Sequence, residues 1–139
     1  MPNRKNMTMV FLVAMVVVQT MACGSSSSNR VLQSIAVAPA TADAQNNANA
    51  QVQFTATGTF SKSPSPSPVT FAAPYSGSWA VSDPMIATLV GTGTGTATFQ
   101  CVGGASGMVT ITAAASTNAA TGTAATSTMV RGTASLTCP

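Results

Sequence analysis

The ten residues QVQFTATGTF, Gln51 to Phe60, alternate strictly in polarity. Every even-numbered position from Val52 to Phe60 is apolar or glycine, and every odd-numbered position from Gln51 to Thr59 is glutamine or threonine. Successive side chains of a β-strand point to opposite faces of the sheet, so this pattern predicts a half-buried strand.

The same pattern recurs on both sides of this stretch, in short runs separated by glycine, proline, asparagine and serine. About seven short strands of this kind predict an all-β antiparallel sandwich. The alanine-rich stretch 113–125 is interrupted by Thr, Ser, Asn and Gly, which favours a loop over a helix. The further candidate strands are Ser34–Val37, Ser78–Ser82, Met85–Val90, Thr94–Val102, Met108–Ala115 and Ser127–Cys138.

Three other stretches are interpreted as loops. Ala42 to Ala50, rich in Ala and Asn, is expected to be exposed, and Gly91 to Thr96 to form a turn into the next strand. Ser61 to Pro68, SKSPSPSP, cannot be an interior strand because proline lacks the N–H donor. We expect an extended, polyproline-like protrusion there, either a passive loop or a recognition segment for a partner.

The first 22 residues have the pattern of a secretory signal peptide. Arg4 and Lys5 precede the apolar run Met7 to Val18, which is shorter than the roughly 20 residues of a membrane-spanning helix. Residues 1–22 are therefore expected to direct export.

Cys23 follows this leader directly. The stretch Thr20-Met21-Ala22-Cys23 resembles the lipobox of bacterial lipoproteins, although that motif usually has leucine where Thr20 stands. We expect Cys23 to be lipidated, with residues 23–30 as a flexible Gly/Ser tether to a membrane. The alternative is ordinary secretion with an unmodified Cys23. Gly24 does not resemble the aspartate retention signal of some enteric bacteria, which favours the outer membrane of the cell envelope.

The composition argues against catalysis. The chain has no His and no Glu, and its two carboxylates, Asp43 and Asp83, stand forty positions apart. General acid–base chemistry needs such groups close together, so we expect no enzyme, no cofactor and no metal site. A hydrolase using Asp43 or Asp83 is the weaker alternative. The net charge of +3 comes largely from the leader, so nucleic acid is not an expected partner.

Few large side chains are available for a core. Trp79 shares parity with Val81 and is expected at the core's centre with Phe54 and Phe99; a surface ligand-stacking role is the alternative. Cys101 has the parity of Phe99, and Cys138 that of Leu136, so both should face inward. We predict a Cys101–Cys138 disulfide, worth about 4 kcal/mol on the chain-entropy estimate.

Four stretches in order are similar to the bacterial immunoglobulin-like domain, group 2: VLQSIAVAPA, QVQFTATGTF, SWAVSDPMIATL and GMVTITAAAS. The resemblance spans roughly Val31 to Leu136, and residues 31–139 are expected to form one immunoglobulin-like β-sandwich domain. The matching positions are Gln53, Phe54, Thr55, Ala56, Trp79, Ser82, Ala87, Gly107, Ile111 and Ala113. The Pro-rich segment and residues 72–77 depart from the family by lengthening the path to Trp79.

This resemblance implies surface adhesion or display. Together with the expected lipid on Cys23, it leads us to expect a lipid-anchored module of the cell envelope with a non-catalytic binding, adhesion or structural role. Its expected partners are the membrane, through lipid on Cys23, and an envelope protein or glycan, met by strand edges and loops. An envelope carbohydrate-binding module is the alternative, with Tyr75 as the candidate aromatic platform.

Overall fold

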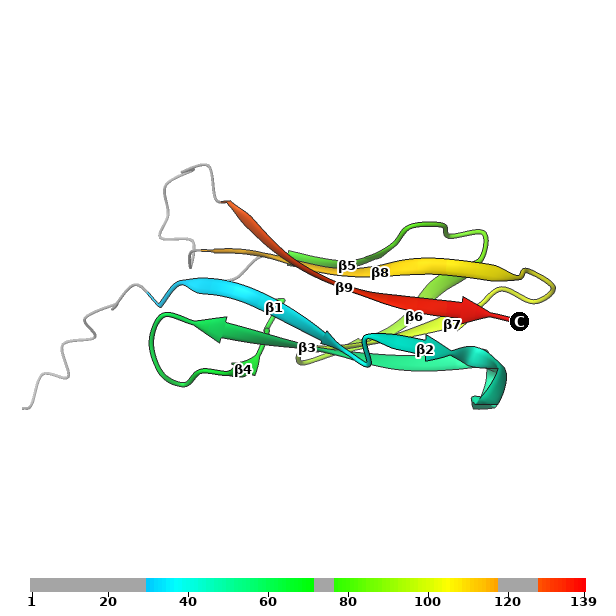
Figure 1. Cartoon of the computed structure of the whole chain (residues 1–139), viewed down its shortest axis with the longest axis horizontal. Coiled ribbons are helices and arrows are strands. Elements are labelled where there is room, and N and C mark those ends of the chain that lie inside the picture. The colour runs from blue at the N-terminus through cyan, green and yellow to red at the C-terminus, as the bar shows by residue number, and fades with distance from the viewer. Residues whose placement is uncertain (1–29, 72–76, 118–127) are drawn as a thin grey trace, which may run out of the picture.

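The computed structural model describes residues 30–71, 77–117 and 128–139, which form two β-sheets packed face to face (Figure 1). Two short 3-10 helices, η1 (Ala44–Asn46) and η2 (Ala48–Ala50), lie between the second and third strands. The strands are β1 (Leu32–Ala38), β2 (Thr41–Asp43), β3 (Gln51–Phe60), β4 (Ser67–Pro68), β5 (Gly77–Val81), β6 (Ala87–Gly93), β7 (Thr96–Cys101), β8 (Gly107–Ser116) and β9 (Met129–Cys138).

The order of strands within the sheets identifies the type of sandwich. One sheet runs β1-β3-β7-β6, with β4 also paired to β3, and the other runs β2-β9-β8-β5. Without the short β2 and β4, the remaining seven strands take the letters A to G in chain order, which gives sheets ABED and CFG. That is the arrangement of an immunoglobulin-type sandwich, so the predicted fold class is confirmed.

The described residues form nine strands rather than about seven. The two additional strands, β2 and β4, are only three and two residues long. Runs this short show no period in the sequence. β2 pairs in parallel with β9, and every other strand pair is antiparallel.

The prediction for Gln51 to Phe60 is confirmed: in β3, Val52 and each second residue up to Phe60 are buried. β7 is shorter than β3 and pairs with it only from Gln51 to Thr55. Beyond that point the Ala56 N–H donates to the carbonyl of Gly95, and β4 pairs with Thr57 and Gly58. The backbone groups along this side of β3 are thus shared among β7, the β6–β7 turn and β4.

The expected polyproline-like protrusion at Ser61 to Pro68 is wrong. The segment folds back, so that Ser67–Pro68 pairs with β3 as β4. The Ser65 hydroxyl accepts from the Phe60 N–H at 2.8 Å, which closes the loop on the end of β3. Serine alternates with proline in this segment. The serine hydroxyls accept hydrogen bonds from backbone N–H groups of the domain, which an extended protrusion would not reach.

The expected exposed loop at Ala42 to Ala50 is also wrong in part. Its start belongs to β2, and Ala44 in η1 is fully buried. The Asp43 carboxylate caps η1 by accepting from the Gln45 N–H at 2.9 Å. A single buried alanine among polar residues has no periodicity, which is why the sequence pattern did not reveal it.

Two other expected boundaries shift by a few residues. β6 begins at Ala87 rather than Met85, because the Asp83 side chain and carbonyl hold a turn through bonds to the N–H groups of Met85, Ile86 and Ala87. β6 then continues to Gly93, with an irregular register between Leu89 and Gly91, so the turn expected from Gly91 narrows to Thr94 and Gly95.

Aromatic rings form the centre of the core, as predicted. Phe54 and Phe99, on neighbouring strands of one sheet, pack edge to face with centroids 6.1 Å apart. Trp79, on β5 of the opposite sheet, meets Phe99 at 6.3 Å and so joins the two layers. Trp79 is only 8% exposed, which confirms the core interpretation.

The two long sides of the sandwich differ. On one side β9 approaches the backbone of β1 so closely that a Cβ on Gly132 would lie 2.4 Å from the Ile35 carbonyl oxygen. On the other side the sheets end in the edge strands β5 and β6. The first side is closed by backbone packing, and the second leaves room between the sheets.

Candidate binding pocket between β5 and β6

The predicted disulfide is present in the structure. Cys101, at the end of β7, and Cys138, at the end of β9, are bonded with Cα atoms 5.7 Å apart, within the usual range for a bridge. Both residues are buried, at 7% and 3% exposure. Because β7 and β9 belong to different sheets, the bridge staples the two layers together, at the end of the sandwich near the C-terminus (Figure 1).

Two residues singled out from the sequence lie outside the described residues: Cys23, the predicted lipidation site, and Tyr75, the candidate aromatic platform. Within the described ranges, no helix is long and apolar enough to cross a membrane.

The two carboxylates each hold a turn. The Asp43 side chain accepts from the Gln45 N–H, and that of Asp83 accepts from the Met85 N–H at 2.8 Å. In residues 30–71, 77–117 and 128–139 no three His, Cys, Asp or Glu side chains gather as a metal site would require. Both aspartates thus have a local structural role in stabilising backbone amides.

Arg30, the last residue of the predicted tether, is held by the segment Ser61–Pro68. Its guanidinium lies over the Phe60 ring, 3.4 Å from the centroid, and donates to the carbonyl oxygens of Lys62 and Pro64. It also donates to the Ser67 hydroxyl at 2.7 Å. The start of the domain is therefore fixed to the loop between β3 and β4, a role that the sequence pattern did not suggest.

We expect Arg30→Gln to loosen this loop, because a neutral amide loses the cation–π contact and the forked donors. A local loss of about 1–2 kcal/mol should speed amide exchange at Phe60 and Ser61 by roughly 5–30-fold. Arg131→Gln, at an exposed arginine on β9, is the matched control. Equal exchange rates in both variants would contradict a holding role for Arg30.

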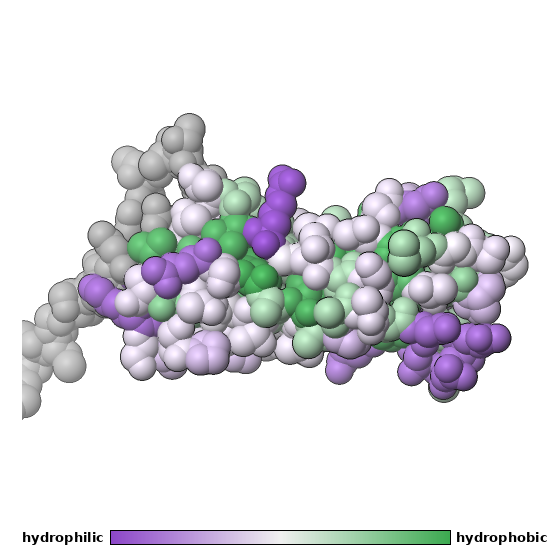
Figure 2. Space-filling model, viewed as in Figure 1, coloured by the Kyte–Doolittle hydropathy of each residue, from purple (hydrophilic) through white to green (hydrophobic). Residues whose placement is uncertain are grey.

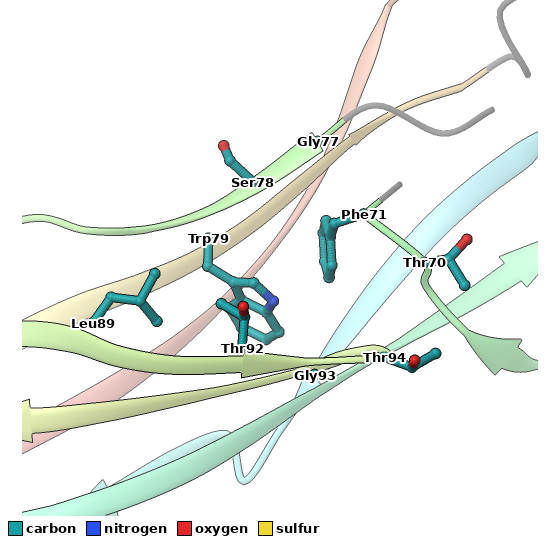
Figure 3. Close-up of a pocket in the computed structure, with 9 residues that line it drawn as sticks. All are labelled: Thr70, Phe71, Gly77, Ser78, Trp79, Leu89, Thr92, Gly93 and Thr94. Carbon is teal, nitrogen blue, oxygen red and sulfur yellow. The ribbon is translucent and has the colours of Figure 1, made fainter. Parts of the chain in front are cut away.

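A pocket of about 500 Å³ opens between the edge strands β5 and β6 (Figure 3). Its walls come from three places: β5, the end of β6 with the following turn, and the segment after β4. Trp79, Phe71 and Leu89 supply apolar surface, and threonine supplies a hydroxyl group. The lining residues are Thr70, Phe71, Gly77, Ser78, Trp79, Leu89, Thr92, Gly93 and Thr94.

Trp79 links this pocket to the core. Its ring packs on Phe71 with centroids 5.4 Å apart and a tilt of 53°. The indole Nε1 is buried and has no hydrogen-bond partner among the residues that the structure describes. Buried polar groups are nearly always paired, so an orphaned donor in a pocket wall is unusual.

The sequence pattern identified Trp79 but missed the pocket around it. Phe71, Leu89 and Thr92 come from segments far apart in the chain, and only the pairing of the sheets brings them together. None of these residues is charged or of a typical catalytic type, so no signal in the sequence indicates that they form a site.

Comparison of the sequence with models of known protein families gave no match, and comparison with curated proteins found no similar chain. The resemblance to group 2 bacterial immunoglobulin-like domains thus rests on the quoted stretches alone.

Proposed function

We propose that the chain is an exported module, anchored to the bacterial cell envelope by lipid on Cys23, with a non-catalytic binding, adhesion or structural role. The observation that carries this proposal is the disulfide between Cys101 and Cys138. A buried bridge of this kind is typical of proteins that mature in an oxidising compartment.

The bridge also accounts for two of the chain's three cysteines. The remaining one, Cys23, stands after an apolar run and before Gly24 and four serines, seven positions ahead of Arg30. The odd number of cysteines supports the proposal, because lipid on Cys23 would leave no unpaired thiol in an exported chain.

The face of the domain seen in Figure 2 carries few strongly hydrophilic groups. Most of the face in Figure 2 is only weakly polar, and strongly hydrophilic groups gather over η1 and η2 and near the start of β1. The strand order adds weight to the resemblance with group 2 bacterial immunoglobulin-like domains, which implies adhesion or display.

Replacing Cys23 by serine tests the anchor. In a bacterial host, the full chain is expected in the membrane fraction, and the Cys23→Ser variant at least about tenfold less so, because several acyl chains bind a bilayer far better than none. Mass spectrometry of the purified chain should show an acylated N-terminal cysteine. Ser25→Ala, in the same tether, is the control and should leave the partition unchanged.

Equal partition of Cys23→Ser and the unchanged chain would overturn the anchor, as would an unmodified Cys23 in the mass spectrum. Free thiols at Cys101 and Cys138 in the native protein would remove the main support for export.

An envelope carbohydrate-binding module is the second candidate. The observation that favours it is the pocket beside Trp79, where aromatic and hydroxyl groups meet without any charge.

A further inference from the structure

We propose that the pocket between β5 and β6 binds an uncharged sugar that carries an N-acetyl group, such as a unit of an envelope glycan. This inference deepens the second candidate function, and it depends on the proposed envelope location only for where the ligand would be met.

The position of the pocket makes it reachable. It lies where the sandwich is not closed by backbone packing, between two edge strands that have no further neighbour in the described part of the chain. Leu89, at its rim, is 42% exposed, so a ligand can enter without crossing a sheet. The volume of about 500 Å³ falls within the range of small-molecule sites.

The lining excludes a charged ligand. None of its nine residues is ionisable, and an ion moved from water into such a site would lose hydration without gaining a partner. The lining is instead mixed: Trp79, Phe71 and Leu89 supply apolar surface, and Figure 3 draws the Thr92 hydroxyl over Trp79. The side chain of Ser78 points to the other face of β5. Sugars match this mixture, because a pyranose ring has apolar C–H faces and a rim of hydroxyl groups.

The unpaired indole N–H specifies the N-acetyl group. The Trp79 Nε1 donor needs an acceptor, and Figure 3 shows the nitrogen on the side of the ring turned toward Phe71. An acetamido group places a carbonyl acceptor next to a methyl group, so it can pair with the donor while remaining against the aromatic rings. Because Nε1 is buried, the half-buried Phe71 must turn slightly to admit the carbonyl.

Trp79 itself provides the measurement, since it is the only tryptophan of the chain. The full exported chain, kept in a detergent without a sugar headgroup, is titrated with N,N′-diacetylchitobiose and with cellobiose. These disaccharides have the same linkage and differ in having acetamido or hydroxyl groups at position 2. We expect a saturable change in Trp79 fluorescence with the first sugar and at least about tenfold weaker binding of the second, as loss of a paired acceptor implies.

Two matched variants locate the site on β6. Thr92→Val removes a lining hydroxyl while keeping the side-chain shape, and should weaken binding of N,N′-diacetylchitobiose about fivefold. Thr88→Val, on the same strand but outside the pocket, should change it less than twofold. Trp79→Phe keeps an aromatic ring without the N–H, and calorimetry should show that it no longer distinguishes the two disaccharides.

Three results would overturn the proposal: no fluorescence change with either disaccharide, equal affinity for both, or equal effects of Thr92→Val and Thr88→Val. Because binding is measured apart from any membrane, these outcomes are independent of whether Cys23 carries lipid. Membrane release of Cys23→Ser together with failed sugar binding would leave the anchor supported and the pocket proposal refuted.

Discussion

Replacing Cys101 and Cys138 together by alanine is expected to lower the free energy of unfolding by about 4 kcal/mol. The two residues are 37 positions apart, and opening that loop returns chain entropy to the unfolded state. Stabilities of single domains are only about 5–15 kcal/mol, so this loss is a large share of the total. Urea denaturation followed by Trp79 fluorescence measures it.

A reducing agent supplies the control for this double variant. Reduction of the unchanged chain should lower its urea midpoint to about that of the double alanine variant. The same reagent should leave the midpoint of the double alanine variant unchanged. A loss below about 1 kcal/mol in the double variant would mean that the bridge adds little to the packing of the sheets.

Truncating Phe99 to alanine is expected to cost about 3–5 kcal/mol, the usual range for a large aromatic residue in a core. Phe99 is fully buried and contacts both Phe54 in its own sheet and Trp79 in the opposite one. Removal of its ring therefore breaks the aromatic contact between the two sheets and leaves a cavity between Phe54 and Trp79. Thermal or urea unfolding gives the change in stability.

Two further variants make the Phe99 result interpretable. Val90→Ala, at a position that is 48% exposed on the adjoining strand, should change stability by no more than about 0.5 kcal/mol. Phe99→Leu should lose less stability, about 1 kcal/mol, and it replaces Phe99→Ala in the measurement if the alanine variant does not fold. Similar losses for Phe99→Ala and Val90→Ala would show that the aromatic centre does not dominate the core.

Most of the longer strands could be predicted from the sequence because burial of one face leaves a period of two. β6 is the exception, since Ala87 is its only buried residue. In β3 the alternation extends over all ten residues and in β8 from Met108 to Ala115, and the predicted strands agree with the structure closely. The inward parity of Cys101 and Cys138 followed from the same rule, and with it the bridge.

What could not be predicted depends on contacts between distant segments. The return of Ser61–Pro68 onto β3 depends on hydroxyl and carbonyl groups that meet Arg30 across more than thirty positions. The pocket depends on which strands end the two sheets, and on the missing backbone closure between β5 and β6. Neither property is encoded in a local period.

The bridge has a consequence for a chain attached to a surface by one end. A backbone cut at any point between residues 101 and 138 divides the polypeptide, but the severed C-terminal piece keeps its covalent link through Cys138. A cut before residue 101 leaves no covalent link between the anchor side and the residues that follow it. If Cys23 is the anchor, as proposed, proteases outside the cell could nick the last third of the domain without shedding any of it.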